Sequence, residues 1–301
     1  MERLRSASLI TAIKTPYTPS GDIDLETYDQ LIKDQIKHGV EGVIVGGTTG
    51  EGHLMSWDEQ VMLIAHSVHS YGSELFVVGN TGSNNTREAL HATHQGFAVG
   101  MHASLQINPY YGKTSAAGML THLGRALNLG PAYIYNVPAR TSQDIPDEIM
   151  IELAKSPNMI GVKECTGNER IQRYEENGIA CWSGNDDEAS AGRHKHGSHG
   201  VISVTSNLVP GLMRKLMDNL DADLEARLAP LMNWLFSEPN PIAINTILAM
   251  TGAAKPVFRL PYVPLDAAGR ARGIEVLKAF AAEEIVGHVP TELADDDFIL
   301  V

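Results

Sequence analysis

An α/β fold is predicted by three observations on the amino-acid sequence. Eight short apolar runs recur within the first ~225 of its 301 residues. The segments between these runs carry apolar residues at helical spacing, as in Tyr28, Leu31, Ile32 and Ile36. From Pro210 onward no strand-like run is convincing, and helical patterns take over. Together these observations predict a (β/α)8 TIM barrel followed by a C-terminal helical domain.

The eight apolar runs are expected to be parallel strands, because a parallel connection needs a crossover segment such as the helices predicted between them. An open, doubly wound sheet is the structural alternative, although it usually has five to seven strands. The barrel domain is placed at residues 1–225. The predicted strands are Leu9–Ile13, Val43–Val45, Leu75–Val78, Ala103–Ile107, Ala132–Tyr135, Met159–Val162, Ile179–Trp182 and Val201–Val204.

The rest of the chain, residues 226–301, is predicted to form the C-terminal helical domain. Five prolines between residues 239 and 264 punctuate this region, since proline interrupts a helix. The predicted helices after the last strand are Leu212–Leu220, Leu224–Phe236, Ile242–Met250 and Ala267–Ala282.

Composition excludes several classes of partner. The net charge is −13 and no basic run occurs, whereas nucleic acids and anionic membranes are bound through clustered Lys and Arg. No stretch approaches the ~20 apolar residues of a membrane span. The first 17 residues show no separate signal-peptide core and cleavage site. Cys165 and Cys181 form no CxxC pair, so they are expected to be free thiols in a reducing compartment.

The carboxyl ends of barrel strands carry the catalytic groups of this fold, so the residues there are the candidates. After the second strand, the Gly46–Gly52 loop contains Thr48 and Thr49; it is either an anion-binding cradle or a tight turn with N-capping threonines. After the fourth strand, Tyr110 and Tyr111 lie on a loop, where they either face a site or pack locally.

The fifth and sixth strands end in the most chemically informative residues. Tyr135 is expected at the barrel mouth, where a phenol can transfer a proton. Arg140 follows on a proline-braced loop and suits a bidentate carboxylate clamp, with a surface salt bridge as the alternative. Lys163 closes an apolar strand, where burial should lower its pKa and let its neutral amine attack a carbonyl. The alternative is a lysine that reaches solvent or pairs with Glu164.

Other polar segments are less informative. Two such segments can either line a pocket or cap a helix. They are Ser183–Asp187, a segment after the seventh strand that contains Gly184, and Thr205–Asn207 after the eighth strand. The seven histidines that cluster or lie at i,i+3 spacing are expected to be exposed helix residues and not metal ligands, because they lack carboxylate or thiol neighbours at strand ends. They are His66, His69, His91, His94, His194, His196 and His199.

Taken together, the strand-end motifs resemble the dihydrodipicolinate synthase family over essentially the whole chain. The matching blocks are GGTTGEG (46–52), NPYYGKT (108–114), YNVPART (135–141), GVKECTG (161–167), GVISVTSN (200–207) and EPNPI (238–242). Each block is moderately specific, and six in the same order are highly specific. Further segments, such as MSWDEQ (55–60), resemble the plant and algal branch.

This resemblance implies a pyruvate-condensing lyase that needs no metal and no dissociable cofactor. Pyruvate would form an imine with Lys163, and L-aspartate 4-semialdehyde would then condense with it to give 4-hydroxy-tetrahydrodipicolinate in lysine biosynthesis. Thr48, Tyr135 and Tyr111 match the family's proton relay, Tyr111 reaching into the partner subunit's site. The substrate-binding positions that match are Thr49, Arg140, Gly184 and Ile202.

The resemblance also implies feedback inhibition by lysine and a homotetramer built as a dimer of dimers. It implies residence in the plastid stroma if the source is a plant or alga, and otherwise in the cytoplasm.

Two alternatives stay open. One is a sister pyruvate-dependent aldolase such as N-acetylneuraminate lyase, which the presence of the carboxylate-binding Arg140 disfavours. The other is a non-catalytic lysine sensor, which the presence of the imine-forming Lys163 disfavours. The positions that match the lysine site are Gly52, His53, Met55, Trp57, Gln60, Asn84, Glu88 and Tyr110.

Overall fold

The computed structural model describes residues 1–301 and contains a closed barrel of eight strands. The strands follow one another around the barrel in chain order. Each of the six neighbouring pairs from β2–β3 to β7–β8 is parallel. Their bounds are β1 Leu9–Ala12, β2 Gly42–Val45, β3 Phe76–Asn80, β4 Ala103–Ile107, β5 Ala132–Asn136, β6 Met159–Glu164, β7 Cys181–Ser183 and β8 Gly200–Ser203.

The chain divides into two compact units, which are described separately. Unit 1 comprises Met1–Ile10, Glu41–Val45 and Ser56–Ile202 and contains β2 to β7 entire. Unit 2 comprises Thr11–Val40, Gly46–Met55 and Ser203–Val301.

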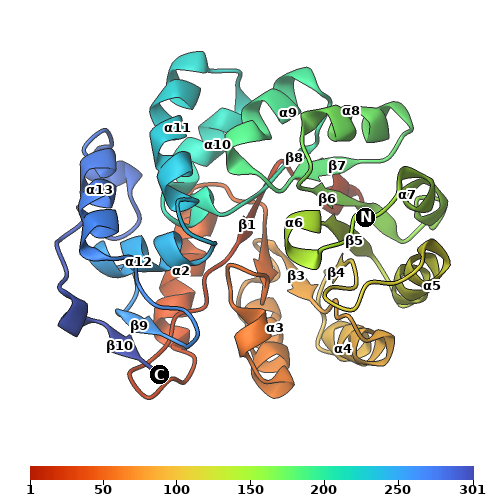
Figure 1. The fold of residues 1–301 in the computed structure, drawn as a ribbon, viewed down its shortest axis with the longest axis horizontal. Helices are drawn as coiled ribbons and strands as arrows, with labels where there is room; N and C mark the ends of the chain where they lie inside the picture. The colour runs from red at the N-terminus through yellow and green to blue at the C-terminus, as the bar shows by residue number, and fades with distance from the viewer. The chain divides into compact units, whose positions relative to one another are not determined.

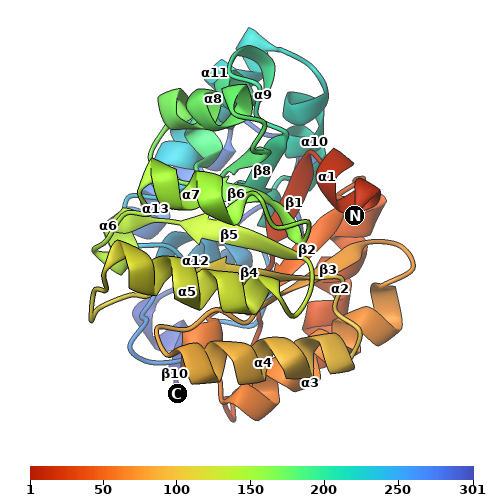
Figure 2. The ribbon, with the colours of Figure 1, turned by 90° about the vertical axis from the view of Figure 1, so that its right-hand side faces the viewer.

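Helices of unit 1 surround its strands, as the strand–helix alternation predicts (Figure 1). Figure 2 shows α4, α5 and α7 running side by side along β4 to β6. A buried apolar cluster between this helix layer and the strands includes Leu123, Ile134, Met150, Val162 and Ile171. The helix bounds in unit 1 are α1 Glu2–Ser6, α3 Trp57–Tyr71, α4 Thr86–Ala98, α5 Ala116–Leu127, α6 Pro138–Thr141, α7 Asp147–Leu153, α8 Asn168–Glu176 and α9 Ala189–Lys195.

Local sequence signals explain where these helices begin. Ser56 and Glu59 form a capping box at the start of α3, which satisfies backbone N–H groups that a helix start leaves unpaired. Ser115 caps α5 and Asn85 caps α4 with a single side-chain acceptor, which bonds to the N–H of Gly118 and of Arg87, respectively. The short α1 and the residue after it bond to the barrel strands: the Tyr133 hydroxyl donates to the Leu4 carbonyl oxygen, 2.7 Å away.

Unit 2 contains the remaining helices, and Asp24, Asp221 and Asp266 cap three of them. Its two short strands, β9 Val257–Phe258 and β10 Ile299–Leu300, pair in parallel. The helix bounds are α2 Leu25–Lys37, α10 Pro210–Asp218, α11 Ala222–Leu235, α12 Ile242–Met250 and α13 Ala267–Leu277. The single 3-10 turns of unit 2 are η1 Gly52–Leu54, η3 Thr205–Asn207, η4 Ala282–Glu284 and η5 Asp295–Asp297, whereas η2 Asp186–Glu188 belongs to unit 1.

The predicted barrel is confirmed, and its closure excludes the open-sheet alternative. Helix α12 matches its predicted bounds, whereas α13 ends at Leu277 and not at Ala282. The prediction of no strand after Pro210 missed β9 and β10, because two-residue strands carry no periodic signal. The predicted domain boundary stays a prediction; residues 225 and 226 lie inside α11.

Candidate active site

Lys163 and Tyr135 lie side by side in unit 1. They pair in register on β6 and β5, so their side chains share the inner face of the barrel. The Lys163 Nζ lies 4.6 Å from the centroid of the Tyr135 ring. Lys163 is 8% exposed and Tyr135 is 6% exposed, which leaves the amine shielded but not sealed from solvent.

The surroundings of Lys163 favour its neutral amine. Burial lowers the pKa of Lys163, the negative charges of Cys165 and Asp186 oppose this, and the positive Arg140 adds to it. Burial also raises the pKa of the Cys165 thiol to about 11.

Gly184 leaves the space that the Lys163 side chain needs. A Cβ atom at residue 184 would lie 3.0 Å from the Lys163 Cε and 2.2 Å from the Cys165 Sγ. Glycine is therefore required next to the amine for reasons of space.

Glu164 does not pair with Lys163. Its side chain is fully buried, and its oxygens accept hydrogen bonds from the Asn136 Nδ2 and from the backbone N–H groups of Cys165 and Thr166. Successive strand residues point to opposite faces, so Glu164 lies outside the barrel while Lys163 lies inside. The alternative of a Lys163–Glu164 ion pair is thus excluded.

Arg140 lies on the single-turn helix α6, directly after β5. Its side chain is exposed, and its charge acts on both Lys163 and Cys165. The turn ends at Ser142 in a left-handed conformation with φ of 57°. An exposed guanidinium whose field reaches a buried amine suits the predicted carboxylate clamp.

Tyr111 lies on the loop that follows β4 and is 90% exposed. Its φ is 68° and that of Lys113 is 48°, which are uncommon values for residues other than glycine. The side chain of Gln143 holds this loop: the Thr114 N–H donates to its Oε1 at 2.8 Å, and its Nε2 donates to the Thr114 carbonyl. The single chain therefore presents an anchored loop with an exposed phenol at its tip.

In unit 2, the predicted Gly46–Gly52 loop is a tight, polar turn. Thr49 is buried, and its Oγ1 accepts a hydrogen bond from the Asn240 Nδ2 at 3.1 Å. Thr48 is half-buried, and its carbonyl accepts from the Glu51 N–H at 3.2 Å. No sequence argument had singled out Glu51, although it is an acid inside a glycine loop at a strand end.

Glu51 forms a buried ion pair with Lys14 in this unit. The Lys14 Nζ lies 2.7 Å from the Glu51 Oε1, which also accepts from the Asn245 Nδ2 at 2.5 Å. Burial lowers the pKa of Lys14, whereas the Glu51 charge and hydrogen bond oppose that effect. Lys14 closes the first apolar run just as Lys163 closes the sixth, so the signal used for Lys163 was also present at Lys14.

The remaining predicted positions are distributed over both units. Ile202 is fully buried on β8. In unit 1, the side chains of Trp57 and Gln60 on α3 donate to the Gln95 side chain and to the Asn80 carbonyl. Asn84 Nδ2 lies 3.4 Å from the Tyr110 carbonyl, and Glu88 is exposed in the first turn of α4. In unit 2, Gly52 begins η1, His53 Nε2 lies 2.9 Å from the Tyr262 hydroxyl and Met55 ends that turn.

The histidine segment 194–199 differs from its prediction, because His194, His196 and His199 are all half-buried and not exposed. His194 lies on α9 and His196 directly follows that helix. His199 follows α9 in a half-buried loop, with its ring 5.1 Å from that of Trp182 and its Nδ1 2.7 Å from the Arg5 carbonyl. It is therefore a packing residue and not an exposed helix residue. No group of three or more His, Cys, Asp and Glu side chains is placed to hold a metal ion.

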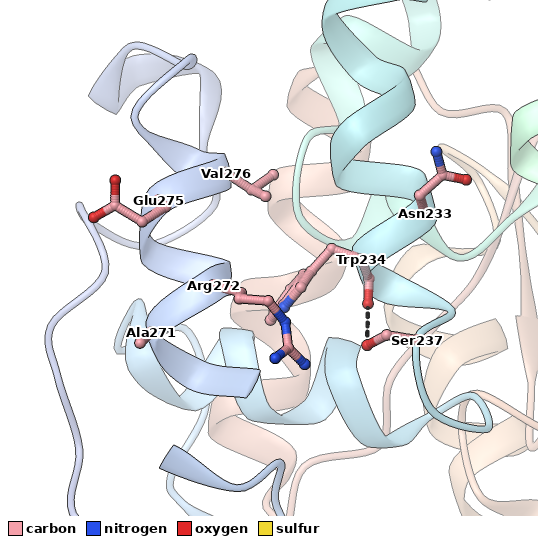
Figure 3. A pocket seen from close by; sticks show the side chains of 7 residues that line it. All are labelled: Asn233, Trp234, Ser237, Ala271, Arg272, Glu275 and Val276. Carbon is pink, nitrogen blue, oxygen red and sulfur yellow. Dashed lines mark hydrogen bonds between the residues drawn. The ribbon is translucent and has the colours of Figure 1, made fainter. Parts of the chain in front are cut away.

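A separate cleft of about 560 Å³ lies in unit 2 between α11 and α13 (Figure 3). The Trp234 ring points from α11 toward α13, and its Nε1 donates to the Gly269 carbonyl at 3.0 Å. None of the predicted site residues lines this cleft. The cleft is therefore separate from the candidate active site. It is lined by Asn233, Trp234, Ser237, Ala271, Arg272, Glu275 and Val276.

Comparison with known proteins agrees with the barrel fold. The model of the dihydrodipicolinate synthetase family matches residues 5–280. The chain belongs to this family. It is accordingly an enzyme of the lyase class, as its relatives are.

Individual relatives support this assignment. The chain is 59% identical over 300 residues to 4-hydroxy-tetrahydrodipicolinate synthase 1, chloroplastic, of Arabidopsis thaliana, covering 99% of this chain and 82% of that protein. The dihydrodipicolinate synthase of Acinetobacter baumannii complexed with pyruvate is 30% identical, with a TM-score of 0.86 over 91% of this chain and 98% of that one. The enzyme of Cyanidioschyzon merolae with lysine bound is 28% identical, with a TM-score of 0.86 over 91% and 98%.

None of the helices combines the length and the apolar character that crossing a bilayer would require.

Proposed function

We propose that this protein condenses pyruvate with L-aspartate 4-semialdehyde to 4-hydroxy-tetrahydrodipicolinate through a Schiff base on Lys163. The observation that carries the proposal is the buried Lys163 amine, whose Nζ lies 4.6 Å from the Tyr135 ring and whose pKa burial lowers. A neutral amine at the carboxyl end of a barrel strand is the nucleophile that imine formation requires. The names of the relatives give the reaction class.

The chemistry follows in three steps. The Lys163 Nζ attacks the pyruvate ketone and water leaves, which gives the imine. The imine loses a methyl proton to become an enamine, whose carbon attacks the aldehyde of the second substrate and forms the new C–C bond. The amine of that substrate then attacks the imine carbon, which closes the ring and releases Lys163 as a free amine.

The other predicted residues have proposed roles in these steps. The hydroxyls of Tyr135, Thr48 and Tyr111 carry protons to and from the reacting atoms. Arg140 binds the carboxylate of the semialdehyde bidentately. Thr49, Gly184 and Ile202 shape the pyruvate pocket, and Gly184 does so by leaving room beside the Lys163 Cε. The proposal includes no metal and no dissociable cofactor.

Borohydride reduction in the presence of pyruvate tests the mechanism. Reduction of the imine should add one pyruvate-derived mass to the peptide that contains Lys163 and should abolish activity irreversibly. Lys163→Ala should show no label, whereas Lys14→Met, which removes the other buried strand-end lysine, should keep the label. A label on any other residue, or none, contradicts the proposal.

Lysine is proposed as a feedback inhibitor that binds through Gly52, His53, Met55, Trp57, Gln60, Asn84, Glu88 and Tyr110. Glu88 is an exposed carboxylate suited to the effector's ammonium group, and Asn84 offers an amide to its carboxylate. A lysine titration of activity tests this: inhibition should appear below about 1 mM, and Glu88→Gln should weaken it about tenfold, the loss of one charged contact. Full activity of the wild type at millimolar lysine overturns the idea.

The proposed assembly is a homotetramer made from two dimers, and the proposed location is the plastid stroma. The exposed Tyr111 supports a dimer, because a proton-relay phenol that is 90% exposed in one chain needs a partner to shield it. The chloroplastic names of the plant relatives support the location.

A further inference from the structure

Outside the barrel, directly behind Lys163 and Tyr135, lies a second pair of residues. Asn136 and Glu164 follow Tyr135 and Lys163 on β5 and β6, and they also pair in register. Because side chains alternate along a strand, this pair faces away from the barrel interior. Both residues are completely buried.

The Glu164 carboxylate is surrounded by hydrogen-bond donors. Asn136 Nδ2 lies 3.1 and 3.0 Å from its two oxygens, and the backbone N–H groups of Cys165 and Thr166 donate to its Oε1 at 2.9 Å. Arg170 Nε lies 3.9 Å from its Oε2. Glu164 therefore fixes both the neighbouring strand and the two residues that follow Lys163 in the chain.

Asn136 joins the two ends of the segment that carries Arg140. Its Nδ2 donates to the Asp144 Oδ1 at 2.8 Å, and its Oδ1 accepts from the Ile145 N–H at 3.1 Å. The intervening residues 137–143 form a loop whose two ends are thus held by one amide side chain. Arg140 lies in the middle of that loop.

Arg170 on α8 secures this arrangement from the helix layer. Its Nη1 lies 2.5 Å from the Asp144 Oδ2, and its Nη2 donates to the Ile145 carbonyl at 2.5 Å. Its Nε donates to the Tyr174 hydroxyl at 2.9 Å. The guanidinium therefore holds Asp144 and Ile145, the two residues to which Asn136 is bonded.

From this geometry we infer that Asn136 and Glu164 are positioning residues: they hold Lys163, Tyr135 and the Arg140 segment in their reactive arrangement from outside the barrel. This inference rests on the proposed function, since it assigns the pair to the support of that reaction. A displacement of about 1 Å in a reacting group can reduce a rate about a hundredfold, so such supports have large kinetic effects.

Asn136→Ala tests the inference, with Asn158→Ala as the matched control. Asn158 is a half-buried asparagine just before β6, and its Nδ2 donates to the Leu127 carbonyl at 2.8 Å, far along the strand from Lys163. Amide hydrogen exchange should speed up in residues 137–146 for Asn136→Ala and not for the control. The KM for the semialdehyde should rise about tenfold and the rate of borohydride-trapped imine formation should fall, whereas the control should change either by less than about twofold.

Glu164→Gln should show the same kinetic pattern. The amide N–H of the new glutamine would face the hydrogen-bond donors that now bond to the Glu164 carboxylate. If Asn136→Ala does not fold, Asp144→Ala removes the same tie at a side chain that is 43% exposed. The inference is overturned if exchange and KM match the control, or if exchange speeds up without any kinetic change. Absence of a pyruvate label on wild-type Lys163 would instead overturn the proposed function. In that case hydrogen exchange would still report whether Asn136 holds residues 137–146.

Discussion

Two lysines, Lys14 and Lys163, are buried at the ends of apolar strands, yet their surroundings give them different chemistry. Lys14 lies 2.7 Å from the Glu51 carboxylate, which favours its charged form. Lys163 lies over the Tyr135 ring with no carboxylate at hydrogen-bond distance. Burial lowers the pKa of both amines, but only at Lys14 does a hydrogen-bonded carboxylate oppose that shift.

The pH dependence of imine formation should report the lowered pKa of Lys163. The rate should rise with pH while the neutral amine accumulates and should level off below the ordinary lysine pKa of about 10.4. Rapid-quench borohydride trapping with saturating pyruvate, over a pH series, measures it. A rate that still rises about tenfold per pH unit near pH 10 would show that the Lys163 pKa is not lowered.

The same burial has a cost in stability, with a definite sign. A base whose pKa is lowered by folding destabilises the folded state as the pH falls from its unfolded pKa to its folded pKa, and the lost stability is regained as the pH rises back to the unfolded value. Lys163→Met should therefore abolish activity and raise the free energy of unfolding at pH 7 by about 1 kcal/mol. Urea unfolding should show this gain shrinking as the pH approaches 10.

At the scale of the element, the Gly46–Gly52 turn depends on one charged side chain. Glu51 has a left-handed φ of 57°, and a Cβ at Gly52 would lie 2.0 Å from the Gly46 carbonyl oxygen. The Lys14–Glu51 ion pair and the Asn245 amide stabilise this conformation. Thr48 and Thr49 lie in the turn that these contacts hold, and the Asn240 amide bonds to Thr49 directly.

Glu51→Gln should destabilise the protein by about 3 kcal/mol, because it leaves the Lys14 ammonium buried without its counter-charge. The loss should shrink at high pH as Lys14 loses its proton, and the double variant Lys14→Met with Glu51→Gln should recover part of it. Urea unfolding measures these differences.

The exposed pair Lys155–Glu152 provides the control for this experiment, since its side chains are 67% and 49% exposed. Removing that pair with Lys155→Met and Glu152→Gln should cost less than about 1 kcal/mol. If the single Glu51 variant is as stable as this control, the buried pair does not hold the turn.

At the scale of the whole molecule, one chain is incomplete as a catalyst if Tyr111 serves a partner. Its phenol is exposed at the tip of a loop with two left-handed residues, and Gln143 anchors that loop. Such a conformation persists only where the surrounding structure enforces it, and it is concentrated at functional sites.

Mixing two inactive variants tests this dependence on a partner. Co-expressed Lys163→Ala and Tyr111→Phe chains form mixed dimers in which one site has both intact residues, so activity should recover to about a quarter of the wild-type value. Separately expressed variants, combined without subunit exchange, are the control. No recovery on co-expression would place Tyr111 in its own chain's site, and activity of Tyr111→Phe expressed alone would place it outside any site.

Much of the fold was predictable because apolar periodicity is local. Each predicted strand lies within two residues of an observed one, since the alternation of buried strands and amphipathic helices is written in neighbouring residues. The Asn136–Glu164 pair was not predicted. It depends on the register of two strands separated by more than twenty residues, which no local pattern specifies.

By itself the sequence determined the barrel, the positions of the strand ends and the presence of lysines at two of them. Only the tertiary structure decided that Glu51 lies against Lys14 and that Tyr135 lies against Lys163. The physical reason is that a pKa depends on burial and on charges within a few ångströms. Those neighbours come from distant parts of the chain and meet only when the chain is folded.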